Sequence, residues 1–133
     1  MISQNWATPD WLFDELDKEF NFDLDVAPRN SKIDFLLYPW AQSNFCNPPF
    51  PTQIKTDFVK KAIQEQKKGN KTVFILPVHT GSRLSHNLIV PYSKDIRFLK
   101  GRIKFEQFDH YGDTVKNGAC ELGAPFNTMI VIF

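Results

Sequence analysis

The tetrapeptide Asn47-Pro48-Pro49-Phe50 constrains the fold of this chain more than any other feature, because it joins two segments of different character. Residues 43–46 predict a short buried strand that runs directly into the tetrapeptide, and residues 52–68 predict an amphipathic helix that begins just after it. A rigid polar loop between a strand and a helix lies at the edge of an open α/β sheet where such folds bind ligands. The sequence therefore predicts an α/β fold with a functional loop at the carboxyl end of strand 43–46.

The chemistry of the tetrapeptide suits the binding of a planar amine. Two consecutive prolines fix φ near about −65° and remove two N–H donors, so the Asn47 side-chain oxygen and the Pro48 carbonyl can both act as acceptors on a stiff loop. The exocyclic amine of adenine is a poor nucleophile, and two oriented acceptors would direct its lone pair toward an electrophilic methyl group. Phe50 offers a flat face on which an extruded base could stack. The same residues also suit an ordinary turn at the end of a strand.

The rest of the chain predicts alternating helices and strands. Thr8 is the predicted cap of a first helix, with Pro9 at its first position and an apolar face of Leu12, Phe13, Leu16 and Phe20. Further predicted strands are residues 21–26, 72–76, 95–99, 102–105 and 127–133, and a short helix covers residues 83–90. The helix after the tetrapeptide has a predicted buried stripe of Ile54, Phe58, Ala62 and Ile63 and ends near Gly69. Residues 28–40 are predicted to be irregular, with Trp40 in the core.

Composition restricts the class of protein. With 133 residues, 42% of them hydrophobic, residues 1–133 are expected to form one domain. No apolar run approaches the ~18 residues of a membrane span, and the N-terminus lacks a signal pattern, so we expect a cytoplasmic protein that does not enter a membrane. Cys46 and Cys120 suggest no disulfide framework, and no metal is expected because the three histidines have no metal-ligand spacing.

Charge is distributed unevenly along the chain. Residues 1–50 carry a net charge of −5, residues 51–77 carry +4 and residues 78–133 carry +2. The basic middle and C-terminal portions could face phosphates, although solvated helix faces also collect lysines.

The chain resembles the phage DNA N-6-adenine methyltransferase family over nearly its full length. The similar blocks occur in the family's order and are Trp6-Ala7-Thr8-Pro9, residues 22–27, Asn30, Trp40, the tetrapeptide, Leu76-Pro77, His86, residues 100–105 and Ala124-Pro125-Phe126. Phe50 stands where the family more often has Tyr, which keeps the stacking face and removes a hydroxyl. Pro51 stands where the family usually has a small residue.

This resemblance implies an S-adenosylmethionine-dependent enzyme that methylates adenine N6 in double-stranded DNA. It implies a single Rossmann-like methyltransferase domain with helices on both faces of its sheet. The implied catalytic residues are Asn47, Pro48, Pro49 and Phe50, and the implied cofactor-binding residues are Thr8, Pro9, Asp25, Ala27 and Asn47. The oligomeric state is left open.

The cofactor segment departs from the usual pattern, because residues 25–30 contain no glycine. Asp25 is the expected acidic contact, and its alternative role is a strand-end cap. Only 21 residues separate Asp25 from Asn47, too few for a full set of strands and helices, so we expect a reduced sheet.

Two other functions remain open from the sequence. The first is methylation of another planar amine, cytosine N4 or a protein glutamine, and the second is a non-catalytic nucleic-acid-binding relative. Because no extra domain separates the cofactor and catalytic segments, target reading is expected to fall to loops 78–93 and 106–125 and to give a short or relaxed recognition site. His86 and Arg102 are candidates for DNA contacts, although both also suit an exposed surface.

Overall fold

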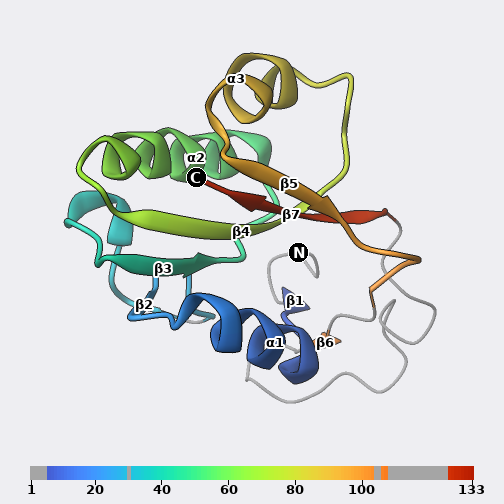
Figure 1. Cartoon of the computed structure of the whole chain (residues 1–133), viewed down its shortest axis with the longest axis horizontal. Coiled ribbons are helices and arrows are strands. Elements are labelled where there is room, and N and C mark those ends of the chain that lie inside the picture. Colours follow the sequence, from blue (N-terminus) through green and yellow to red (C-terminus); the bar gives the residue numbers. More distant parts are fainter. Residues whose placement is uncertain (1–5, 30, 104–105, 108–125) are drawn as a thin grey trace.

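A five-stranded mixed sheet forms the centre of the computed structural model, which describes residues 6–29, 31–103, 106–107 and 126–133 (Figure 1). The strand order is β2-β3-β4-β7-β5. The parallel strands are β2 (Leu24–Asp25), β3 (Ser43–Cys46) and β4 (Lys71–Pro77). The strand β7 (Thr128–Ile132) runs antiparallel to both β4 and β5 (Asp95–Phe98). The predicted α/β class with a reduced sheet is confirmed.

Helices cover both faces of this sheet, as predicted. Figure 1 shows α1 (Asp10–Phe20) on one face and α2 (Thr52–Lys67) on the other. A helical segment after β4 contains the π-helix η3 (Ser85–Ile89) and the short helix α3 (Val90–Tyr92), and a 3₁₀ turn, η2 (Phe35–Leu37), precedes β3. A separate antiparallel pair joins β1 (Trp6–Ala7) to β6 (Glu106–Gln107). No helix in the described ranges is long and apolar enough to cross a membrane.

The two faces of the sheet have separate cores, because side chains alternate along each strand. In β4, Val73 and Ile75 pack in the core that contains Leu12 and Leu16 of α1. The core on the opposite face includes Phe74 and Leu76 of β4, Phe58, Val59, Ala62 and Ile63 of α2, and Trp40. All five residues of β4 between Thr72 and Leu76 are buried, which confirms it as the central strand of the sequence prediction.

Several predicted elements differ in detail. The predicted strand 21–26 contains only Leu24 and Asp25, although the Asp23 and Val26 N–H groups also donate to carbonyls of residues 43 and 45. Within the predicted strand 102–105, residues 102 and 103 form no strand, and residues 104–105 lie outside the described residues. Thr8 does not cap α1, since Pro9 occupies the N-cap position and no side chain caps the helix.

The helix α2 is rotated relative to its predicted stripe. Ile54 is 38% exposed, whereas the neighbouring Lys55 is only 7% exposed. Lys55, Phe58, Val59 and Ala62 follow the same 3.6-residue spacing, so the stripe was present in the sequence but its first member is charged. The helix ends at Lys67, and Gly69 has a φ of +89°, as expected for the predicted stop.

Candidate active site

The proposed functional loop lies where the parallel strands of the sheet end, after β3 and between β2 and β4. Because β2, β3 and β4 are parallel, their carboxyl ends lie at the same edge. Asp25 ends β2, the tetrapeptide Asn47–Phe50 follows β3, and Pro77 ends β4. The structure therefore brings the predicted catalytic segment between Asp25 on one side and the end of β4 on the other.

A hydrogen bond from outside the tetrapeptide orients Asn47. Its Nδ2 donates to Thr8 Oγ1 at 3.0 Å, across 39 residues of sequence. Both residues are half-buried. This contact uses the donor end of the amide, and no donor from the described residues contacts Asn47 Oδ1. The acceptor end of the amide is thus available to a ligand.

Phe50 is half-buried and lies between two different neighbours. Its ring packs against Phe126 with ring centroids 5.5 Å apart and an interplanar angle of 46°. The ammonium of Lys55 lies 5.6 Å from the Phe50 centroid. Pro48 and Pro49 are also half-buried, so the whole tetrapeptide is at the boundary between core and solvent. The stacking role predicted for Phe50 remains a prediction.

Asp25 forms a local turn at the end of β2. Its Oδ1 accepts from the Ala27 N–H at 3.0 Å, which is the strand-end cap foreseen as the alternative role of Asp25. The residue is exposed overall, but protein around its carboxyl group raises the pKa of Asp25, and the Ala27 hydrogen bond partly offsets this rise. Burial and then the Asp25 charge raise the pKa of the Cys46 thiol well above its usual range. Asp25 pairs with Phe45 in the parallel register, so it lies next to the end of β3.

The remaining predicted cofactor residues lie at the start of α1 and just after β2. Pro9 is buried at the start of α1, and Ala27 is half-buried against the α2-side core. No group of three or more potential metal ligands occurs in the part of the chain that the structure describes. His86 and Arg102 are both exposed. His110 and Cys120 fall outside the described residues.

Sequence reasoning missed Lys55 as a member of the site. The residue begins the buried stripe of α2 and reaches the same edge of the sheet as the tetrapeptide. Burial lowers the pKa of Lys55 below its usual value. Its spacing to Phe58, Val59 and Ala62 was the signal that could have revealed it, since a lysine in an apolar helical stripe is unusual.

Comparison with known proteins identifies the family of the chain. The model of the family described as DNA N-6-adenine-methyltransferase (Dam) matches residues 2–130. A protein of Haemophilus phage HP1 (strain HP1c1) named DNA N-6-adenine-methyltransferase is 33% identical over 115 aligned residues, and the match covers 75% of this chain and 65% of the relative. The chain thus spans about two thirds of the length of that relative. By the match along almost all of its length, this chain belongs to the DNA N-6-adenine-methyltransferase (Dam) family.

Proposed function

We propose that this protein methylates the N6 amine of adenine in DNA, with S-adenosylmethionine as the methyl donor. The observation that carries the proposal is the orientation of Asn47. Its Nδ2 is engaged by Thr8 Oγ1, so Oδ1 is left as an acceptor beside the rigid Pro48-Pro49 segment. Family membership supports adenine over cytosine N4 or a protein glutamine as the acceptor.

The residues of the tetrapeptide would act by positioning. Asn47 Oδ1 and the Pro48 carbonyl would each accept one hydrogen from the adenine amine, which fixes the amine and directs its lone pair out of the plane of hydrogen bonding. A preorganised pair of acceptors also stabilises the positive charge that develops on the amine nitrogen. Phe50, which is half-buried, would hold the extruded base by stacking.

The residues at the ends of β1 and β2 fit the methyl donor. When bound, S-adenosylmethionine supplies an electrophilic methyl group on a cationic sulfur. Asp25 is an exposed residue at this edge, one of its carboxylate oxygens accepts from the Ala27 N–H, and no donor from the described residues contacts the other oxygen. A carboxylate in this position can accept from hydroxyl or ammonium groups of a cationic ligand. Thr8 and Pro9 lie near the same ends of the strands, because Thr8 accepts a hydrogen bond from Asn47.

The segment after β2 contains no glycine and forms a local turn through the hydrogen bond between Ala27 and Asp25. The Ala27 N–H is turned toward the Asp25 carboxylate, so recognition there would depend on a carboxylate and not on a glycine-rich loop of free N–H groups. We therefore expect the segment to recognise the nucleoside part of the donor.

The test is direct. Unmethylated duplex DNA is incubated with the protein and S-adenosylmethionine, and the digested nucleosides are identified by mass spectrometry. N6-methyladenine is the expected product, whereas N4-methylcytosine alone or methylated glutamine in protein substrates would refute the assigned acceptor. Calorimetry with S-adenosylmethionine distinguishes an active enzyme from a relative that binds nucleic acid without the donor. Sequencing of the methylated DNA then tests the expectation of a short or relaxed recognition site.

A further inference from the structure

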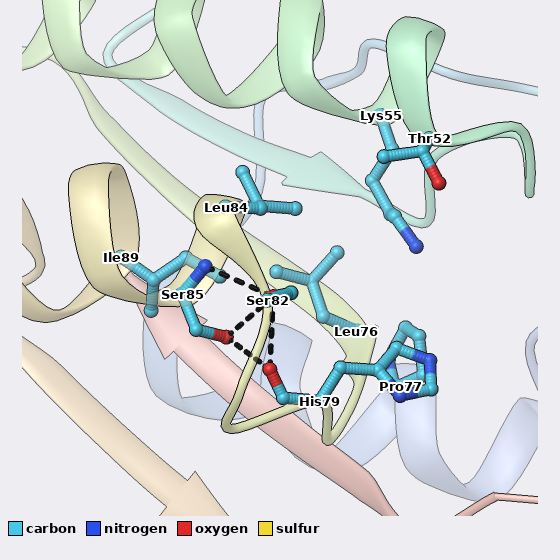
Figure 2. Close-up of a pocket in the computed structure, with 9 residues that line it drawn as sticks. All are labelled: Thr52, Lys55, Leu76, Pro77, His79, Ser82, Leu84, Ser85 and Ile89. Carbon is cyan, nitrogen blue, oxygen red and sulfur yellow. Dashed lines mark hydrogen bonds between the residues drawn. The ribbon is translucent and has the colours of Figure 1, made fainter.

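A small pocket opens beside the tetrapeptide, on the side away from the predicted cofactor residues. It lies between the first turn of α2, the end of β4 and the helical segment that contains η3, and its volume is about 50 Å³ (Figure 2). Its polar lining comes from Thr52, Lys55, His79, Ser82 and Ser85. A volume of this size accommodates a few water molecules or one small anionic group.

Lys55 supplies a buried positive charge to this pocket. Its amine points into the pocket from α2, as Figure 2 shows, although the residue is only 7% exposed. Among the described residues, no carboxylate pairs with this ammonium and no acceptor forms a hydrogen bond with it. The ammonium lies over the Phe50 ring, 5.6 Å from its centroid. Lysine is almost never buried without a partner, so the pocket is suited to an anion from outside the fold.

The start of α2 adds donors to the same place. Pro51 is the N-cap, no side chain caps the helix, and its first turn contains no acidic residue. The N–H groups of a first helical turn have no partner within the helix, and the helix dipole makes this end positive. The 16-residue helix therefore presents unused N–H donors and a partial positive charge next to Lys55.

The opposite wall of the pocket is held in place by a short hydrogen-bond network. The hydroxyls of Ser82 and Ser85 both donate to the His79 carbonyl, at 2.9 and 2.7 Å, and the Ser85 N–H donates to Ser82 Oγ at 3.2 Å. Figure 2 shows these bonds closing the loop between β4 and the helical segment. The wall is thus preorganised, which reduces the entropy that a bound group must overcome.

We infer that this pocket binds a backbone phosphate of the DNA next to the adenine held at Asn47, with Lys55 and the first turn of α2 as its ligands. This inference rests on the proposed function. The contact between Lys55 and Phe50 favours a DNA phosphate, because a base stacked on Phe50 is linked through its sugar to a phosphate close by. The carboxylate of the methyl donor is the less suitable anion, because the proposed donor residues Asp25 and Ala27 lie at the end of β2, which β3 separates from β4.

The experiment compares Lys55→Gln with Lys60→Gln, a matched change at an exposed lysine of the same helix. Affinity for a labelled, unmethylated duplex is measured by fluorescence anisotropy at several salt concentrations. Each phosphate contact contributes about 0.9 to the slope of log K against log salt. For Lys55→Gln we expect affinity to fall by about ten-fold or more and the slope to decrease by about one. Lys60→Gln should change both much less, and Lys55→Arg should restore most of the slope.

Three results would overturn the inference. The first is an unchanged DNA affinity and slope in Lys55→Gln while the wild-type protein still forms N6-methyladenine; the proposed function would then stand without this site. The second is a loss of S-adenosylmethionine affinity with unchanged DNA affinity, which would assign the pocket to the donor. The third is a clear drop in the melting temperature of Lys55→Gln, which would mean that the charge serves the fold. A wild-type protein that binds DNA through Lys55 but forms no N6-methyladenine would refute the proposed function and support the phosphate site.

Discussion

The two ends of α2 each bury one charged side chain, and the surroundings of the two charges are opposite. Glu65, near the carboxyl end, is 1% exposed and accepts from the Trp40 N–H, Asn70 Nδ2 and Lys68 Nζ at 3.4, 2.9 and 3.4 Å. Lys55, in the first turn, is 7% exposed, and its ammonium forms no hydrogen bond or ion pair within the described residues. Burial acts on both groups, but only Glu65 has neighbours that compensate it.

The pKa shifts of these groups reflect the same difference. Burial raises the pKa of Glu65, but hydrogen bonds from Asn70, Lys68 and Trp40 outweigh this effect and the net pKa is lowered. Burial lowers the pKa of Lys55, and no neighbour of opposite charge among the described residues counteracts it. Hydrogen bonds and ion pairs offset the cost of burying a charge, whereas a buried charge without them destabilises the fold and indicates a ligand site. We therefore assign the carboxyl end of α2 to the scaffold and its amino end to function.

The largest expected effect is on catalysis at the amino end. Asn47→Ala removes one oriented acceptor from the reacting amine, so turnover should fall by about 100-fold or more. The melting temperature should change little, because Asn47 is half-buried and its side chain bonds only to Thr8 within the described residues. Single-turnover methylation and thermal melting of the same preparations provide the test. Near-normal methylation by Asn47→Ala would show that the assigned role is wrong.

Asn44 provides a matched control three residues earlier. It is fully buried in β3, where its amide donates to the Ala41 and Lys71 carbonyls and accepts from the Ala41 N–H. Asn44→Ala should therefore lower stability while the folded fraction retains its turnover. Opposite outcomes at these two asparagines would distinguish a structural residue in β3 from a functional residue in the loop that follows it.

Much of the scaffold could be predicted because its signals are local. The strands β3, β4 and β7 and the helix α2 follow from apolar runs, helical spacing and Gly69. The two-residue strands β1 and β6 pair over about a hundred residues, and two residues carry no periodicity to reveal them. The prediction placed Ile54 in the buried stripe of α2 because its side chain is apolar. In the structure the stripe begins with the stem of Lys55 instead.

The candidate site shows the same division between local signals and contacts that only the fold creates. The tetrapeptide could be proposed from the sequence because the chemistry proposed for it depends on its own four residues. The role of Thr8 was not predictable, because its hydroxyl meets Asn47 only after the fold brings the two segments together. Its position next to Pro9 instead suggested a helix cap, which the structure contradicts.

At the scaffold end, Glu65→Ala should lower the free energy of unfolding by about 2–3 kcal/mol, because it leaves the Trp40 N–H and the Asn70 amide without their acceptor. Turnover of the folded protein should be unchanged. Chemical denaturation at neutral pH measures the stability, and activity per folded molecule is the control. A loss of turnover without a loss of stability would invalidate the division of α2.

The lowered pKa of Glu65 predicts that the free energy of unfolding depends on pH. The pKa of Glu65 is lower in the folded protein than its usual value of 4.5, so its contribution is complete above that pH and is lost as the pH falls through the folded-state value. The stability difference between wild type and Glu65→Gln should therefore shrink in acid. A difference that grows below pH 4.5 would mean that the carboxylate is not stabilised in the fold.

A smaller effect is expected from Thr8, which tests whether groups outside α2 organise the functional end. Thr8→Val keeps the shape and removes the hydroxyl that fixes the Asn47 amide, so kcat should fall by roughly ten-fold, the equivalent of one lost hydrogen bond. Thr8→Ser keeps the hydroxyl and should retain the rate. If Thr8→Val instead raises KM for S-adenosylmethionine and leaves kcat unchanged, Thr8 serves the donor, as the family resemblance implied.

The smallest effect is also the most direct test of the comparison. Lys55→Met removes a buried charge that has no ion-pair partner among the described residues, and it keeps a stem of similar length with a sulfur that can contact Phe50. The unliganded protein should therefore become more stable by about 1 kcal/mol. Because the pKa of Lys55 is lowered in the fold, wild type loses the unfavourable proton as pH rises toward the usual value of 10.5. The advantage of Lys55→Met should therefore be present at neutral pH and narrow in alkali, as measured by denaturation at a series of pH values. If Lys55→Met is less stable than wild type, the ammonium has a structural partner, and the two ends of α2 do not differ in the way proposed.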